Sequence, residues 1–204
     1  MPASETPRTA SLLGGLPPTF TSRRGRSAGL SPRDLAALAS EGRIEEISRG
    51  VYRRADAAET AHLDLLAVSL RAPRAVIYGE SALALHELID DIPTKVHIAV
   101  PRGAHRPAIA YPPTAVSQLA PETFDLGIEA FAAAPGETVR VYSAARSVVD
   151  AMRHRARTGE TLALSALGRY LRSGKPGGLR ELQEIARALG ALSTIRPAVE
   201  AVLA

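Results

Sequence analysis

The stretch GLSPRDLAALASEGRIEEISRGVYRR, residues 29–54, gives the clearest indication of the fold of the N-terminal part of the chain. Ser31, Pro32 and Asp34 occupy the N-cap, first-turn and capping-box positions of a helix. Small and apolar residues follow them with helical spacing, and the expected helix ends at Glu41. The first half of the stretch therefore predicts a well-specified helix.

The second half has the pattern of a β-hairpin. Two short runs, residues 43–47 and 51–54, flank Ser48, Arg49 and Gly50. Gly50 can adopt the positive φ that a tight hairpin turn requires. A helix followed directly by such a hairpin is typical of a winged helix-turn-helix, whose wing would carry a cation at its tip.

Helical spacing also predicts which side of the helix is buried. The residues expected to face the core are Leu35, Leu38, Ala39 and Gly42. The outer face is then left to Arg33, Ala37, Ser40 and Glu41. Two shorter helices are expected earlier, over residues 10–16 and 22–28, the second capped by Thr21. Arg33, in the first turn, lies where a recognition helix usually meets base edges.

Net charge gathers in the same region. Residues 20–54 contain eight arginines and four acidic residues, whereas the whole chain has 25 basic and 21 acidic residues, so this segment accounts for the full net charge of +4. Such an excess is the electrostatic footprint of phosphate contact, although a solvated positive face without a partner is an alternative. The residues expected at DNA are Arg23, Arg24, Arg26, Ser31, Arg33, Ser40, Arg43, Arg49 and Arg53.

The rest of the chain predicts a second domain. Residues 1–56 are expected to form the winged helix-turn-helix domain and residues 57–204 a C-terminal domain, with a linker near residues 56–59. Helices are expected over 60–70 and 81–88, and strands over 75–78, 95–100, 127–132 and 138–142. A helical tail follows, divided into four helices by breaks at 158–159, 173–178 and 190. The expected fold class is α+β: a winged helix-turn-helix, then a mixed α/β domain with a helical C-terminal tail.

Composition limits the classes of function. The chain has no cysteine, which excludes disulfides, thiolate metal sites and a cysteine nucleophile. No apolar stretch approaches the roughly 18 residues of a membrane span, and the N-terminus lacks a signal pattern. We therefore expect a cytoplasmic protein without a membrane partner.

Catalysis is not expected either. A nucleotidyltransferase needs a Gly-Ser or Gly-Gly turn followed by two carboxylates one residue apart on the next strand. Gly79 is followed instead by Glu80, and the strand expected over residues 95–100 contains no acid. Asp90 and Asp91 are adjacent, so on a strand they would point to opposite faces. The five histidines lack metal-ligand spacing and no serine lies in a nucleophile elbow, so we expect no catalytic residues, no metal and no cofactor.

Four strings carry a resemblance to a known family. They are SRGVYRR (48–54), YGESALALHEL (78–88), VHIAVPR (96–102) and VYSAARSVVDAMR (141–153). In this order and spacing the chain, from about Thr21 to Val202, resembles the AbiEi-type antitoxins of bacterial type IV toxin–antitoxin systems. The resemblance implies an N-terminal winged helix that represses its own operon by binding inverted repeats in the promoter, with two copies on the DNA. It also implies a C-terminal domain that counteracts a nucleotidyltransferase-like toxin through residues that the sequence does not identify.

One alternative function stays open at this point. A ligand-sensing winged-helix regulator unrelated to a toxin would need a pocket lined by aromatic and polar groups, and the chain has eight aromatic residues and no tryptophan. Within the last string, Ser143 is expected to cap a helix, and Arg146 and Asp150 to form a surface pair rather than a site. His86 is expected to be a partly buried polar residue.

Overall fold

The structure is a computed structural model that describes residues 7–174 and 176–203. Its contacts group the chain into two units. The N-terminal unit contains the chain through Pro73 together with two later segments, Ile109–Pro112 and Ala132–Val139. The C-terminal unit contains Arg74–Ala108, Pro113–Phe131 and the chain from Arg140 onward. Whether 56/57 is the true domain boundary stays a prediction; by contacts, the residues up to Pro73 group with the N-terminal elements.

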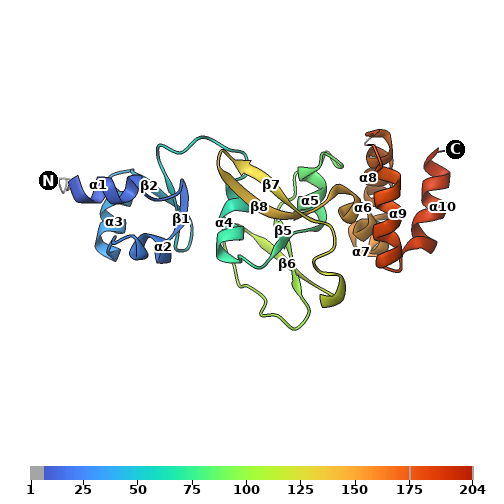
Figure 1. The fold of residues 1–204 in the computed structure, drawn as a ribbon, viewed down its shortest axis with the longest axis horizontal. Coiled ribbons are helices and arrows are strands. Elements are labelled where there is room, and N and C mark those ends of the chain that lie inside the picture. Colours follow the sequence, from blue (N-terminus) through green and yellow to red (C-terminus); the bar gives the residue numbers. More distant parts are fainter. Residues whose placement is uncertain (1–6, 175, 204) are drawn as a thin grey trace. The chain divides into compact units, whose positions relative to one another are not determined.

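The N-terminal unit combines helices with a small antiparallel sheet (Figure 1). Its helices are α1 (Pro7–Gly14), α2 (Ser22–Ser27), α3 (Pro32–Ser40) and α4 (Leu63–Arg71). Its strands are β1 (Thr19–Thr21), β2 (Ile44–Ser48) and β3 (Val51–Arg54), in the order β1-β3-β2. Three helices therefore precede the hairpin, as predicted, although α1 begins and ends earlier than expected. Strand β1 was not predicted because three residues are too few to display an alternating pattern.

The core of this unit forms where α2 and α3 meet the sheet. Phe20, Leu35 and Leu38 are almost fully buried in one cluster. A Cβ added to Gly25 would lie 3.3 Å from Phe20 Cε2 and 3.5 Å from Leu35 Cδ2, so α2 approaches the core closely at this glycine. The expected core face of α3 is thus correct for both leucines.

The same prediction is wrong for Ala39 and Gly42, which are exposed. Ala39 lies on the last turn of α3 and lines an open groove beside β2. Gly42 lies beyond the end of the helix at φ +68°, where the chain turns into β2. The helical spacing was extended past the point at which the helix ends.

The β2–β3 hairpin is also covered by α4. Ile47 and Val51 pack against Ala67 and Leu70 in a small cluster within the N-terminal unit. A helix that follows the expected linker therefore supports the hairpin from its apolar side.

The C-terminal unit is built on a mixed sheet, of which one hairpin end, Ala132–Val139, groups with the N-terminal unit (Figure 1). The elements are β4 (Val76–Ile77), α5 (Gly79–Leu85), β5 (Val96–Pro101), β6 (Thr114–Leu119), the 3₁₀ helix η1 (Pro121–Thr123), β7 (Ile128–Ala134) and β8 (Glu137–Tyr142). The strand order is β6-β5-β4-β8-β7, with β5–β6 and β4–β8 parallel and β4–β5 antiparallel. Strand β6 was not predicted: it lies at the sheet edge and all of its residues are half-buried, so its sequence lacks alternation.

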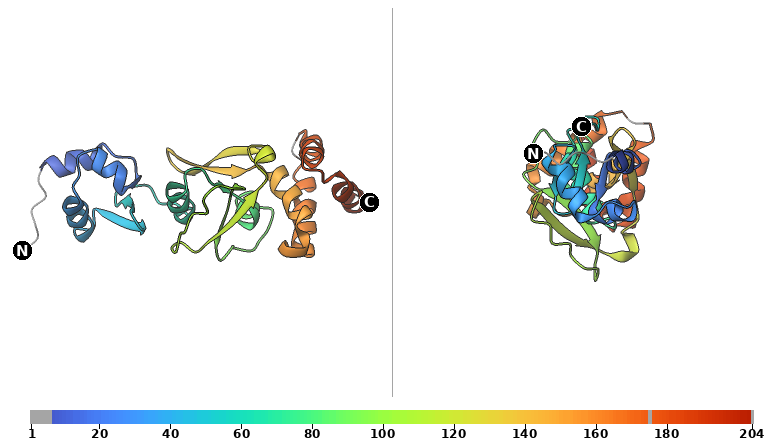
Figure 2. Two further views of the ribbon diagram at one scale, coloured as in Figure 1. Left: turned by 90° about the horizontal axis from the view of Figure 1, so that it is seen from below. Right: turned by 90° about the vertical axis from the view of Figure 1, so that its left-hand side faces the viewer.

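Five helices complete the described C-terminal unit and pack together beside the sheet in Figure 2. They are α6 (Ala144–Arg153), α7 (Arg155–Thr158), α8 (Glu160–Arg172), α9 (Gly178–Ala188) and α10 (Leu192–Leu203). The predicted breaks occur, and a further break at His154 separates α6 from α7. Among the described helices, none has the length and apolar character needed to cross a membrane.

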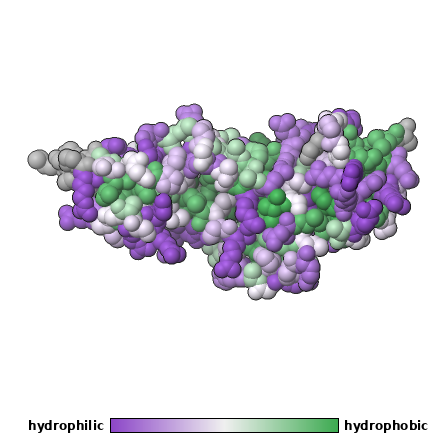
Figure 3. Space-filling model, in the orientation of Figure 1, coloured by the Kyte–Doolittle hydropathy of each residue, from purple (hydrophilic) through white to green (hydrophobic). Residues whose placement is uncertain are grey.

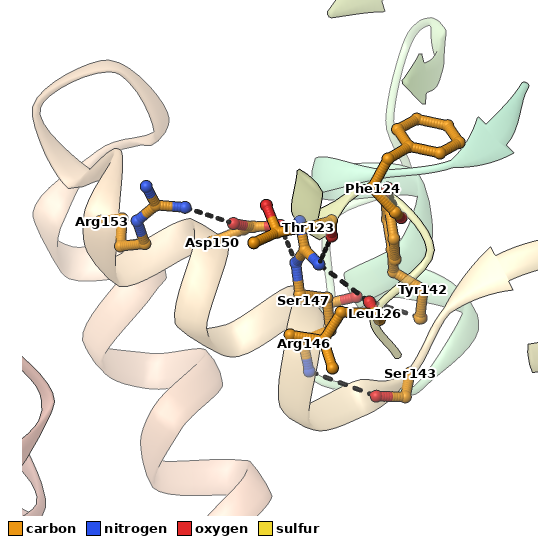
Figure 4. A network of polar contacts seen from close by, with 9 residues as sticks. All are labelled: Thr123, Phe124, Leu126, Tyr142, Ser143, Arg146, Ser147, Asp150 and Arg153. Atoms are coloured by element: carbon orange, nitrogen blue, oxygen red, sulfur yellow. Dashed lines mark hydrogen bonds and ion pairs between the residues drawn. The ribbon is translucent and has the colours of Figure 1, made fainter. Parts of the chain in front are cut away.

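The prediction that Arg146 and Asp150 form a surface pair is wrong. Their side chains are only 1% and 2% exposed, and Arg146 Nε donates to Asp150 Oδ2 at 2.7 Å (Figure 4). The i,i+4 spacing was read correctly, but α6 is surrounded by α5, α8, α9 and α10. A helix covered on so many sides has no solvent-facing side for this pair.

Arg146 also fastens the segment that precedes β7. Its Nη1 group donates to the carbonyl oxygens of Thr123 and Leu126, both at 2.8 Å, and its guanidinium carbon lies 4.5 Å from the centre of the Tyr142 ring. The Tyr142 hydroxyl donates to the carbonyl of Phe124 at 2.7 Å, and burial raises the pKa of this hydroxyl. Every arm of this network ends on a neighbouring backbone or side chain, so its role is to hold the fold.

Two smaller expectations in this unit are confirmed. Ser143 caps α6, since its hydroxyl accepts from the Arg146 N–H at 3.3 Å. His86 is partly buried, and its Nε2 lies 2.8 Å from the carbonyl oxygen of Tyr142.

Candidate nucleic-acid interface

The start of α3 is fixed by a reciprocal cap. The Asp34 N–H donates to Ser31 Oγ at 3.1 Å, and the Ser31 N–H donates to Asp34 Oδ2 at 2.8 Å. Hydrogen bonds from the Ser31 backbone and hydroxyl lower the pKa of the Asp34 carboxyl. The capping box predicted from the sequence is therefore present, and it defines the backbone beneath the exposed Arg33.

Ser40 lies at the other end of the outer face of α3. It is exposed, and its hydroxyl donates to the carbonyl of Ala37 at 2.8 Å. Because that donor is already used, Ser40 presents its oxygen to a ligand as an acceptor.

Three arginines project from α2. Thr21 caps this helix by accepting the Arg24 N–H at 3.1 Å, as predicted. Arg23, Arg24 and Arg26 are exposed, whereas Gly25 between them is buried against the core. The glycine holds the helix against Phe20, so its charged neighbours are turned toward solvent.

The tip of the β2–β3 hairpin lies beside α2. Ser48 pairs with Val51, and Gly50 adopts φ +72° in the turn, as its sequence position predicted. The Ser22 N–H donates to the Gly50 carbonyl at 2.8 Å. The exposed Arg49 is therefore presented next to the first turn of α2.

Arg53 does not lie where the sequence placed it. It is 7% exposed, and its Nη1 donates to Thr19 Oγ1 at 2.6 Å and to Glu137 Oε2 at 2.9 Å. Strand β3 is the central strand of the three, and Arg53 shares its buried side with Val51. We therefore correct the expectation that Arg53 lies at the DNA: its guanidinium is already paired inside the protein.

The remaining cations differ in their surroundings. Arg43 is exposed. Arg54 donates to Asp56 and to the carbonyls of Gly14 and Leu16, so most of its donors are used within the N-terminal unit. The exposed predicted residues are Arg23, Arg24, Arg26, Ser31, Arg33, Ser40, Arg43 and Arg49.

A groove of about 710 Å³ runs beside β2 on the same unit. Its lining includes Glu45, Glu46 and Glu59 and several alanines, and it contains no aromatic residue. Arg53 and Arg54 also line this hollow, but their guanidiniums are paired with Glu137 and Asp56, so the carboxylates disfavour phosphate there. The hollow also lacks the aromatic walls of a typical small-molecule pocket. In Figure 3, hydrophilic residues border the visible face of the N-terminal unit.

Sequence reasoning missed three residues that support this surface. Glu137 binds Arg53 as described, Arg71 Nη1 donates to the Arg49 carbonyl at 2.7 Å, and the Ser48 hydroxyl donates to the Tyr111 carbonyl at 2.6 Å. Tyr111 and Glu137 are more than 60 residues away from their partners in the sequence. No local pattern could have indicated these contacts.

A comparison with known protein families finds a match to the segment that carries this surface. Residues 10–55 match the family model described as "Transcriptional regulator, AbiEi antitoxin". No curated protein matches the chain significantly. The match covers less than half of the chain, and it contains α2, α3 and the three strands of the N-terminal sheet. Residues 10–55 are therefore similar to the AbiEi antitoxin family of transcriptional regulators, which confirms the resemblance for this segment.

Proposed function

We propose that this chain is the antitoxin of a type IV toxin–antitoxin system and the repressor of its own operon. In this proposal the N-terminal elements act as a winged helix-turn-helix on inverted repeats of the promoter, with two copies on the DNA. The rest of the chain counteracts a nucleotidyltransferase-like toxin. The observation that carries the proposal is the capped helix α3 with Arg33 exposed, beside the arginines of α2 and the hairpin, in the segment that matches the family model.

The proposed DNA contacts follow from exposure and hydrogen-bonding capacity. Helix α3 enters the major groove, where Arg33 donates to guanine and Ser40 accepts from a base amino group. The cations that approach phosphates are Arg23, Arg24, Arg26, Arg43 and Arg49. Ser31 lies at the same end of α3 as Arg33 and contributes mainly by fixing the backbone there.

The proposal assigns the chain a binding role and no catalysis. Strand β5 contains no acidic residue, and Asp90 of the adjacent pair Asp90–Asp91 is bound by Arg169. This arrangement differs from the paired carboxylates that hold metal in a nucleotidyltransferase. The catalytic residues of the system would then belong to the toxin.

The DNA-binding part is tested by measuring affinity for the upstream DNA by fluorescence anisotropy at several salt concentrations. Arg33→Ala is expected to cost about 1–3 kcal/mol on the operator and to reduce sequence preference. Arg49→Ala should weaken binding to all sequences and lower the salt slope by about 0.9. Arg180→Ala, on α9 and 84% exposed, is the matched control. Equal affinity of the wild type and both variants would refute the proposed interface.

The antitoxin part needs a separate readout. The full chain is expressed from an independent promoter together with the toxin candidate encoded next to it, and growth is measured. We expect rescue by the wild type and by Arg33→Ala, since neutralisation does not require operator recognition. Absence of rescue by the wild type contradicts the antitoxin role even if DNA binding is observed.

A further inference from the structure

Two distant segments hold the tip of the β2–β3 hairpin. Arg71, at the end of α4, donates to the backbone carbonyl of Arg49 at 2.7 Å. The buried Ser48 hydroxyl donates to the carbonyl of Tyr111 at 2.6 Å. All four residues belong to the N-terminal unit. The tip is thus a supported structure rather than a free loop.

Tyr111 combines a fixed backbone with an exposed ring. Its carbonyl is bound by Ser48, yet its side chain is 65% exposed. An aromatic ring left in water forgoes the free energy that burial would supply, about 25 cal/mol per Å² of apolar surface. Tyrosine also combines an apolar ring with a hydroxyl that can form a hydrogen bond to a polar partner. A ring presented in this way is suited to contact a partner that approaches the hairpin.

The position of Tyr111 indicates which partner. The Ser22 N–H donates to the Gly50 carbonyl, so the hairpin tip contacts both the first turn of α2 and the backbone of Tyr111. This edge of the unit carries the exposed Arg23 and Arg49. A polyanion that binds these arginines would lie within reach of the tyrosine.

We propose that Tyr111 is a further DNA-contacting residue, whose hydroxyl donates to a phosphate oxygen next to the phosphate that Arg49 binds. Tyrosine is among the side chains that make such phosphate contacts in protein–DNA complexes. Arg71 is a positioning residue, because it fixes the backbone from which the Arg49 side chain extends. This inference rests on the proposed DNA-binding function.

The test uses Tyr111→Phe in the full chain, with affinity for the upstream duplex measured over a range of salt concentrations. The ring is exposed and only a hydroxyl is removed, so the fold is retained. Loss of one hydrogen bond to phosphate should weaken binding about three- to tenfold. Because a neutral hydroxyl releases no counterion, the salt slope should stay unchanged, whereas Arg49→Ala should lower it by about 0.9. Ile92→Ala, at a residue 91% exposed in the other unit, is the control and should bind like the wild type.

Arg71 is tested by its effect on Arg49. Arg71→Ala should weaken DNA binding, and Arg71→Lys should weaken it less. The double variant Arg71→Ala with Arg49→Ala should lose less binding free energy than the sum of the losses in the two single variants. Additive effects would refute the positioning role.

The outcomes separate this inference from the function on which it rests. If the wild type and Tyr111→Phe bind equally while Arg49→Ala binds more weakly, the tyrosine contact is refuted and the proposed function stands. If the wild type does not bind the upstream DNA, the proposed function fails first.

Discussion

Helices α2 and α6 use the same side chain for opposite purposes. Arg23, Arg24 and Arg26 on α2 are exposed, and the six residues of α2 include no acid. Arg146 on α6 is buried with Asp150 one turn later and two backbone carbonyls. An arginine is therefore available to an external anion where neither its own helix nor the surrounding core offers it a carboxylate.

Arg53 lies between these two cases. Its neighbours in the sequence suggested an exposed cation, but a carboxylate from a distant hairpin reaches it. Three changes, ordered by their expected effect on stability, test the contrast between buried and exposed arginines.

The largest effect is expected at Arg146. Arg146→Ala leaves the 2%-exposed Asp150 with only the weaker contact to Arg153, so the free energy of unfolding should fall by about 3–5 kcal/mol. Urea denaturation measures the loss, with Arg180→Ala as the exposed control, which should change stability by about 0.5 kcal/mol or less. Replacing both partners, as Arg146→Met with Asp150→Leu, should cost less than the single change. A loss at Arg146 no larger than at Arg180 would contradict the distinction drawn above.

A smaller effect is expected at Arg53. Arg53 Nη1 donates to both Glu137 and the Thr19 hydroxyl, so Arg53→Ala removes a hydrogen bond from each. The free energy of unfolding should therefore fall by about 1–3 kcal/mol. In a double-mutant cycle, Glu137→Gln should couple to Arg53→Ala. The salt slope of DNA binding should be unchanged; a decrease would mean that Arg53 binds phosphate after all.

The smallest effect on stability is expected at Arg26. Arg26→Ala should change the free energy of unfolding by about 0.5 kcal/mol or less, because the side chain is exposed. DNA affinity should nevertheless fall, with the salt slope lowered by about 0.9, since one phosphate contact is lost. Unchanged affinity at low salt would remove α2 from the proposed interface.

The sequence predicted what depends on neighbouring residues. Three such features were predicted: the capping box of α3, the cap of α2 by Thr21 and the positive φ of Gly50. Each depends on residues within a few positions of the chain. The exposed arginines of α2 were likewise identified. These features account for most of the proposed site.

What the sequence did not predict depends on tertiary partners. Nothing near Arg53 indicated that Glu137 would bind it, and the Arg146–Asp150 spacing is the same on a surface helix as on a buried one. Strand β6 has no alternation because it lies half-buried at an edge. Long-range contact decided each of these cases, so local pattern could not.

The N-terminal unit has a consequence for how such regulators can be recombined. Its contacts include Ile109–Pro112 and Ala132–Val139, which are encoded far downstream of the helices and hairpin that they support. A chimera joined at residue 56, or even at residue 73, would remove Glu137 from Arg53 and Tyr111 from Ser48. Transplanting the proposed DNA-binding surface would therefore require three separate segments of the chain, because the unit that carries it is discontinuous in the sequence.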